Sequence, residues 1–83
     1  MSNTRRYKAI LASEEDGGYS VSVPGLPGTF TQGDTIEEAL AMAKEAAELM
    51  ADVMMDDGEP LPDDCEILIE EIEIDLDRLK TAA

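Results

Sequence analysis

Carboxylates are the side chains in this sequence that could hold a metal ion or move protons. They form three adjacent pairs, Asp56–Asp57, Asp63–Asp64 and Glu70–Glu71. Oxygen ligands of this kind suit Mg²⁺ and Ca²⁺. However, the spacing of an EF-hand loop is absent, and adjacent residues on a strand point to opposite faces. Because charged side chains are usually exposed, we interpret the pairs as solvated charge and predict no metal site.

A nucleophile or a general base is harder to find. The chain has no histidine, which is the commonest general base and metal ligand, and one cysteine, Cys65, between Asp64 and Glu66. Two negative neighbours would raise the pKa of that thiol, and no histidine can activate it. The glycines lack the spacing of a phosphate-binding loop. We therefore predict that the protein is not an enzyme, with no catalytic residue and no cofactor.

Negative charge dominates the composition. The 83 residues include 20 acidic and six basic ones, for a net charge of −14, and the segment from Glu45 to Asp77 contains 14 acids and no base. Such a surface repels nucleic acid and anionic membranes and attracts a basic protein, although it also serves solubility alone. The lack of a signal peptide, of a membrane-spanning run and of a cysteine pair predicts a cytoplasmic protein.

Three short runs near the N-terminus alternate as β-strands do. Residues 5–12 and 19–23 each place apolar side chains on one face, and the glycines between them predict a hairpin turn. Residues 24–28 contain two prolines and two glycines, which end the second strand. Residues 29–32 form a third short run. We expect an antiparallel meander of three strands.

A helix is predicted from Asp34 or Thr35, because Asp34 with Glu37, or Thr35 with Glu38, makes a capping box. Helical spacing defines a buried stripe made of Ile36, Leu40, Ala43, Ala47, Met50 and Met54, widened by Ala39, Ala46 and Val53. Met42 and Leu49 widen the apolar face beyond what one sheet needs. We predict that these two residues take part in self-association, as a homodimer or a higher homo-oligomer.

Alternation returns at residues 66–76, which predict a fourth strand. The apolar positions change phase at Glu70–Glu71, which indicates a bulge or two shorter strands. The order β-β-β-α-β predicts one α+β domain over residues 1–83, with two layers and one helix packed on a four-stranded sheet. The other sheet face is only partly polar, which leaves room for a partner.

Residues 18–40 read GYSVSVPGLPGTFTQGDTIEEAL. They resemble the signature of the HicB-like antitoxin family, G-Y-x-V-x-V-P-D-L-P-G-C-x-(S/T)-x-G-D-T-x-x-E-A-L. Gly25 stands where the family often has Asp, and Thr29 where it often has Cys. We interpret the motif residues as turn formers, helix caps and a close contact of helix and sheet; they are Tyr19, Pro24, Gly28, Gly33, Asp34, Thr35, Glu38 and Ala39.

The resemblance implies a partial ribonuclease-H-like fold without catalytic carboxylates, and a type II toxin–antitoxin pair. In such a pair the antitoxin covers the active site of HicA, a small basic mRNA-cleaving toxin whose double-stranded-RNA-binding-like fold carries a catalytic histidine. Many members add a C-terminal DNA-binding domain, which this chain lacks, so we expect no nucleic-acid binding by this chain alone. We expect the interface at the hairpin, the Pro–Gly loop and the acids of the last strand.

Two other functions remain open at this stage. One is an orphan homodimer that has kept the fold but binds a different partner or a small ligand. The other is a metal-dependent hydrolase of ribonuclease-H-like topology, which the missing histidine and the carboxylate spacing argue against.

Overall fold

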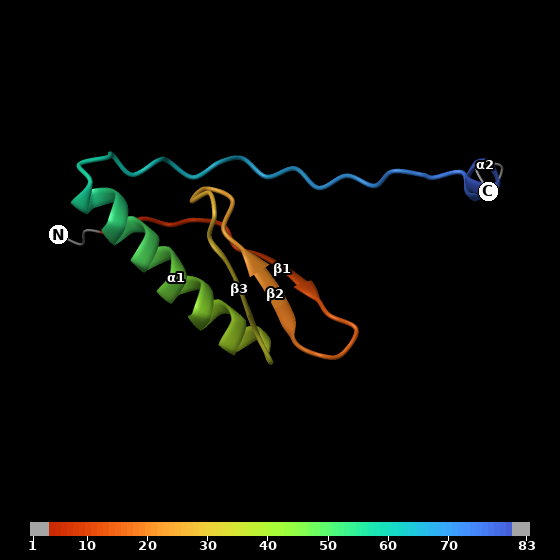
Figure 1. Cartoon of the computed structure of the whole chain (residues 1–83), viewed down its shortest axis with the longest axis horizontal. Coiled ribbons are helices and arrows are strands. Elements are labelled where there is room, and N and C mark those ends of the chain that lie inside the picture. The colour runs from red at the N-terminus through yellow and green to blue at the C-terminus, as the bar shows by residue number, and fades with distance from the viewer. Residues whose placement is uncertain (1–3, 81–83) are drawn as a thin grey trace.

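The computed structural model describes residues 4–80, and within them three strands form an antiparallel sheet (Figure 1). The strands are β1 (Ile10–Ser13), β2 (Tyr19–Ser22) and β3 (Phe30–Gly33), in the order β1-β2-β3. Leu11 lies opposite Val21, which lies opposite Thr31. The predicted meander is confirmed, although the first strand is shorter than expected because residues 5–9 pair with no strand.

The turns form where glycine and proline predict them. Gly17 and Gly18 adopt φ angles of 92° and 83° in the β1–β2 hairpin, a conformation that other residues rarely accept. In the Pro–Gly loop of residues 24–28, the backbone N–H of Leu26 donates to the carbonyl of Val23 (3.0 Å). That turn places the Leu26 side chain in the core, where it is fully buried.

The helix α1 (Ile36–Asp56) begins after Thr35. The Thr35 hydroxyl accepts a hydrogen bond from the backbone N–H of Glu38 (3.0 Å). The carboxylate of Glu38 reaches back one residue further than a standard capping box, to the backbone N–H of Asp34 (3.2 Å). Two backbone donors at the start of the helix are therefore satisfied by side chains.

The core lies between α1 and the sheet. It consists of Val21, Val23, Leu26, Ala39 and Ala43, with Tyr7, Ala9, Leu11, Tyr19, Ala47, Met50 and Met54 packed around it. The contact is closest at Gly33, where an added Cβ would lie 2.5 Å from the backbone nitrogen of Ala39. A glycine facing an alanine lets the helix backbone approach β3.

The buried stripe of α1 is narrower than predicted. Ile36 and Leu40, placed in the stripe by their spacing, are exposed, and so is Val53. The helix faces the sheet with its small residues instead, because Ala39 and Ala43 allow the closest approach. Met42 and Leu49, at the edge of the apolar face, are also exposed.

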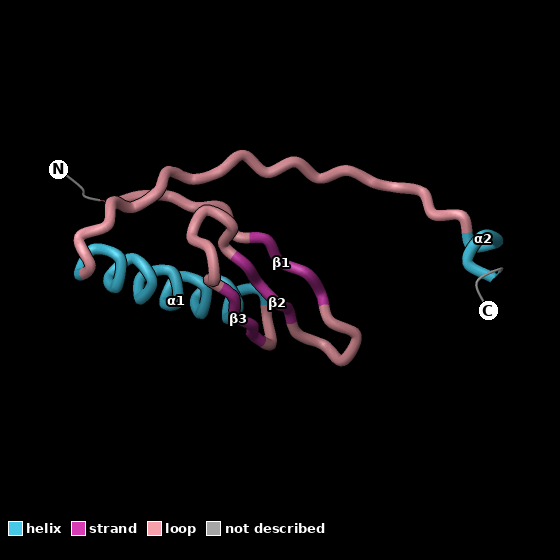
Figure 2. Tube along the Cα trace, turned by 45° about the horizontal axis from the view of Figure 1, so that its top comes forward, coloured by secondary structure: helices cyan, strands magenta, loops and turns pink. Residues whose placement is uncertain are grey.

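The predicted fourth strand does not form within the described residues. Residues 66–75 are extended but belong to no strand, and residues 76–80 form a short helix, α2 (Leu76–Lys80) (Figure 2). The sheet is therefore three-stranded within residues 4–80, and the predicted bulge at Glu70–Glu71 has no ladder to interrupt. This projecting segment gives the molecule a longest extent of 58 Å, against 27 and 22 Å across.

Candidate protein-interaction surface

Residues 66–75, called the arm below, carry a row of exposed apolar side chains. Leu68, Ile69 and Ile72 are 76, 84 and 87% exposed, and Ile74 is exposed as well. Contiguous exposed apolar surface of this kind marks an interaction site in a folded protein. The arm runs away from the sheet and ends at α2, far from the hairpin (Figures 1 and 2).

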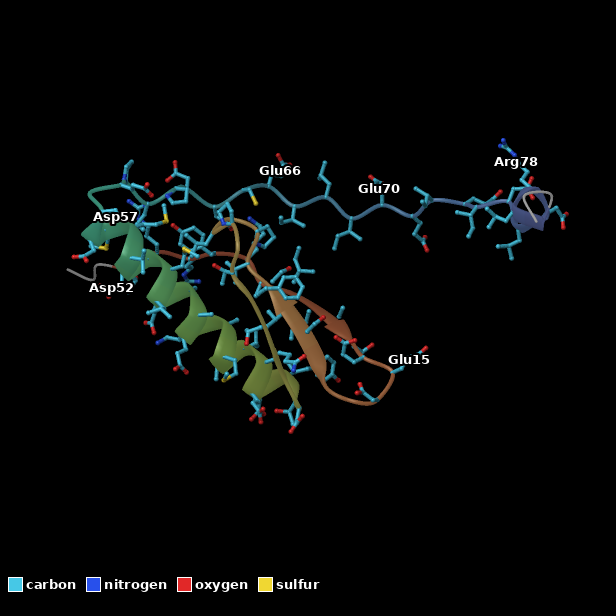
Figure 3. All side chains as sticks on the ribbon, in the orientation of Figure 1. Glu15, Asp52, Asp57, Glu66, Glu70 and Arg78 are labelled. Atoms are coloured by element: carbon cyan, nitrogen blue, oxygen red, sulfur yellow. The ribbon has the colours of Figure 1, made fainter. Side chains whose placement is uncertain are left out.

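The arm is also acidic. Glu66, Glu70, Glu71, Glu73 and Asp75 alternate with its apolar residues and are all exposed. Figure 3 shows Glu66 and Glu70 on the arm and Glu15 on the separate hairpin. The hairpin holds a second group of exposed acids, Glu14, Glu15 and Asp16.

Side chains of residues 5–8 hold the chain just before the arm, at residues 61–65; we call this contact the tail anchor. A guanidinium nitrogen of Arg5 donates to the carbonyl of Leu61 (3.0 Å), and the Tyr7 hydroxyl donates to the carbonyl of Pro62. The Lys8 ammonium lies 2.9 Å from a carboxylate oxygen of Asp64. Residue numbers rise together on both sides, so the two segments run parallel.

Asp64 is the most enclosed carboxylate of the chain, with a side chain that is 19% exposed. Besides the Lys8 ammonium, it accepts hydrogen bonds from the backbone N–H groups of Lys8 (3.1 Å) and Cys65 (3.0 Å). These contacts, led by the side-chain hydrogen bond with Lys8, hold the pKa of Asp64 below its ordinary value. The carboxylate of Asp64 thus holds residues 61–65 to the chain at Lys8.

Gly25 links the tail anchor to the family motif. A Cβ at this position would lie 2.7 Å from the ring of Tyr7 and 2.8 Å from a carboxylate oxygen of Asp64. The glycine that replaces the family's usual Asp therefore lets Tyr7 and Asp64 meet over the Pro–Gly loop. Sequence reasoning missed this contact, because nothing local joins positions so far apart in the chain.

The outer face of the sheet, away from α1, carries both apolar and polar side chains. Phe30 is 73% exposed on this face, and Ile10 lies across Ser22 from it. The predicted interface is not brought together as a whole, since the hairpin and the Pro–Gly loop lie at opposite ends of β2. The Pro–Gly loop lies beside the tail anchor and so beside the start of the arm.

The motif residues are placed along the junction of sheet and helix. Pro24 and Gly28 lie in the Pro–Gly loop, where Gly28 has a φ of 88°, and Gly33 ends β3. Asp34, Thr35 and Glu38 lie at the start of α1, followed by the buried Ala39. Tyr19 lies on β2, opposite Gly33.

A shallow hollow between the hairpin and the start of α1 is lined by four carboxylates, those of Glu14, Asp16, Asp34 and Glu38. No group of histidine, cysteine and carboxylate side chains in residues 4–80 is arranged to hold a metal ion. Cys65 is half-buried and free. Across the same residues, the helices are too short or too polar to cross a membrane.

Comparison with known proteins identifies the group to which this architecture belongs. The sequence model of the HicB-like antitoxin of bacterial toxin–antitoxin systems matches residues 7–79, which include the arm. The chain belongs to the HicB-like antitoxin family. A UPF0150 protein of Thermoplasma acidophilum is similar to it, with 44% identity over 59 residues, covering 71% of this chain and 86% of that protein.

Two relatives carry the name of HicB antitoxins. Antitoxin HicB 1 of Photorhabdus laumondii is 46% identical over 57 residues, which cover 69% of this chain and 37% of that protein. Antitoxin HicB of Escherichia coli K12 is 39% identical over 57 residues, covering 69% and 41%. The HicB-like chain therefore spans less than half the length of these two antitoxins. The family supports an antitoxin role, which is regulatory and non-enzymatic.

Proposed function

We propose that this HicB-like protein neutralises a small basic mRNA-cleaving toxin of the HicA type by covering its active site. The observation that carries the proposal is the position of the charge. All 20 acidic residues lie within residues 4–80, and every one except Asp64 is exposed. Complementary charge of this kind speeds encounter with a basic partner and suppresses wrong partners.

Exposed acids gather on the arm and on the hairpin, and we assign toxin contact to these two surfaces. The remaining parts of the proposal rest on the sequence and on the family resemblance. They are a single domain over residues 1–83, a ribonuclease-H-like topology completed by a fourth strand, cytoplasmic location, and no binding of DNA by this chain alone. A net charge of −14 supports the last of these, because the phosphate backbone repels such a surface.

The proposal predicts a small basic protein encoded beside this gene, and co-expression with that protein tests it. We expect that protein to cleave mRNA and stop growth alone, and both effects to disappear with this chain present. A purified complex should dissociate as salt rises. A neighbour that cleaves no RNA, or cleavage that continues at saturating amounts of this chain, would contradict the proposal.

Charge-matched variants locate the contact. The arm variant Glu70→Gln/Glu73→Gln and the hairpin variant Glu14→Gln/Glu15→Gln each remove two exposed negative charges. The control Glu45→Gln/Asp52→Asn removes two from the exposed face of α1. We expect the arm or hairpin variant to slow association and the control to leave it unchanged. Equal effects of all three would show that net charge, and no particular surface, attracts the toxin.

The second candidate is an orphan homodimer with a different partner or a small ligand. The side chains of Met42 and Leu49 on α1 favour it, because they lie seven residues apart on one side of the helix and are 41 and 66% exposed. Loss of self-association in Leu49→Gln, with no toxin found, would favour this candidate.

A further inference from the structure

The outer face of the sheet carries no charge across its two central rows. The pairing of the strands sets one row across the sheet and a second row beside it, made of Ile10, Ser22 and Phe30, and of Ala12, Ser20 and Gln32. All of these side chains are apolar or neutral, in a chain with a net charge of −14. The centre of a protein–protein interface is likewise depleted of charge and enriched in aromatic side chains.

Phe30 lies on this face although the core is where it would stabilise the fold most. The chain has one phenylalanine and no tryptophan, and its core is small. Tyr7 and Tyr19 pack against the core, whereas Phe30 is 73% exposed. Aromatic side chains dominate the energetics of cores and of interfaces, because each buries a large apolar area. A partner that covers Phe30 would supply the burial that the single chain does not.

Ile10 extends the apolar contact around Phe30. It lies across the small Ser22 from Phe30 and is 36% exposed. Neighbouring strands are about 4.8 Å apart, so the backbones at Ile10 and Phe30 are roughly 10 Å apart. One apolar surface of a partner can therefore contact both side chains.

The acids of the hairpin border the same face. Gln32, in the second row, lines the hollow that Glu14, Asp16 and Asp34 also line. The surface thus passes from an apolar part at Phe30 to a strongly negative rim. A basic partner fits both parts, because its positive charge meets the rim while an apolar patch covers Phe30. A second copy of this chain fits less well, because it carries the same net charge of −14.

We propose that the outer face of the sheet, centred on Phe30, is the surface on which the basic toxin docks, with the acids of the hairpin as its charged rim. This inference rests on the proposed function, which supplies the partner. It adds the apolar centre of the contact, which charge alone does not define. The acids of the hairpin set the rate of encounter, and Phe30 sets the lifetime of the complex.

Binding kinetics of the full chain with the basic protein encoded beside its gene separate these two roles. Phe30→Ala should speed dissociation about tenfold or more and leave association nearly unchanged. The hairpin variant Glu14→Gln/Glu15→Gln should mainly slow association. Met55→Ala is the control, since Met55 is 64% exposed near the end of α1, and it should change neither rate. Urea unfolding of Phe30→Ala checks that the variant keeps its fold.

A photo-cross-linking residue locates the contact without removing the aromatic side chain. We expect p-benzoylphenylalanine in place of Phe30 to cross-link the full chain to the toxin on irradiation. The same residue in place of Met55 should give no cross-link to the toxin. This measurement also decides the matter if Phe30→Ala fails to fold.

The outcomes distinguish this inference from the proposed function. If the chain neutralises the toxin, but position 30 gives no cross-link to it and Phe30→Ala dissociates at the unmodified rate, the inference is wrong and the proposed function stands. A cross-link from position 30 to a second copy of this chain, at saturating toxin, would assign the face to self-association and also overturn the inference. A chain that neutralises no toxin would overturn the proposed function, and the inference with it.

Discussion

The segments before and after Asp57 carry similar patterns of alternating apolar residues, yet they behave differently. In the first, the alternating side chains of β2 meet those of β1, β3 and α1, and Val21 and Val23 are buried. In the second, the arm alternates with a change of phase at Glu70–Glu71, and its apolar side chains from Leu68 to Ile74 remain in solvent. Alternation therefore specifies an extended backbone, whereas burial requires a partner of compatible charge and direction.

The largest expected difference in the free energy of unfolding is between variants at Leu26, which precedes Asp57, and at Leu68, which follows it. Leu26 is fully buried in the core, and Leu68 is exposed on the arm. Leu26→Ala should lower the free energy of unfolding by about 2–5 kcal/mol, because it leaves a cavity. Leu68→Ala should change it by less than about 0.5 kcal/mol at concentrations that keep the chain monomeric. Urea unfolding measures both, and comparable losses would contradict the division.

The contact of helix and sheet at Gly33 gives the next largest effect. A Cβ there would overlap the backbone of Ala39, which cannot move without shifting α1. We expect Gly33→Ala to cost about 3 kcal/mol by overpacking. Gly17→Ala tests the hairpin for comparison, since only its positive φ opposes the change, and it should cost about 1 kcal/mol. Thermal unfolding of the two variants measures which loss of stability is larger.

A substitution of the buried Thr29 should stabilise the fold. Its side chain is buried, and its hydroxyl has no hydrogen-bond partner among the described residues. An unpaired buried hydroxyl costs free energy, so Thr29→Val should stabilise the fold by about 1 kcal/mol. Thr29→Ser keeps the hydroxyl and loses a methyl group, and it should destabilise. If Thr29→Val lowers the melting temperature, the hydroxyl has a partner in solution.

The smallest expected effect is the pH dependence of the tail anchor. The pKa of Asp64 is lowered in the folded chain, so its contribution is fully present above the ordinary carboxyl value of about 4 and is lost as pH falls through the folded pKa. Residues 61–65 should therefore become accessible to hydrogen exchange in acid before the core unfolds. Lys8→Met should raise the pKa of Asp64, measured by NMR titration, whereas Lys44→Met should leave it unchanged.

Local signals explain what the sequence predicted well. The hairpin glycines, the prolines after β2 and the pairing of Thr35 with Glu38 each act within a few residues, so the three strands and the start of α1 could be predicted. Ile36 and Leu40 could not be placed, because helical spacing does not reveal which side a sheet approaches most closely. The tail anchor has no local signal, since it joins side chains to backbone atoms more than fifty residues away.

The parallel start of the arm at the tail anchor also sets an order of events in time. Residues 4–56 fold through contacts between neighbouring elements, which form quickly because the chain segments between them are short. The tail anchor joins residues more than fifty positions apart, so it should form after these contacts. The ordering of residues 61–65 should therefore follow the folding of residues 4–56 as a slower step within each chain.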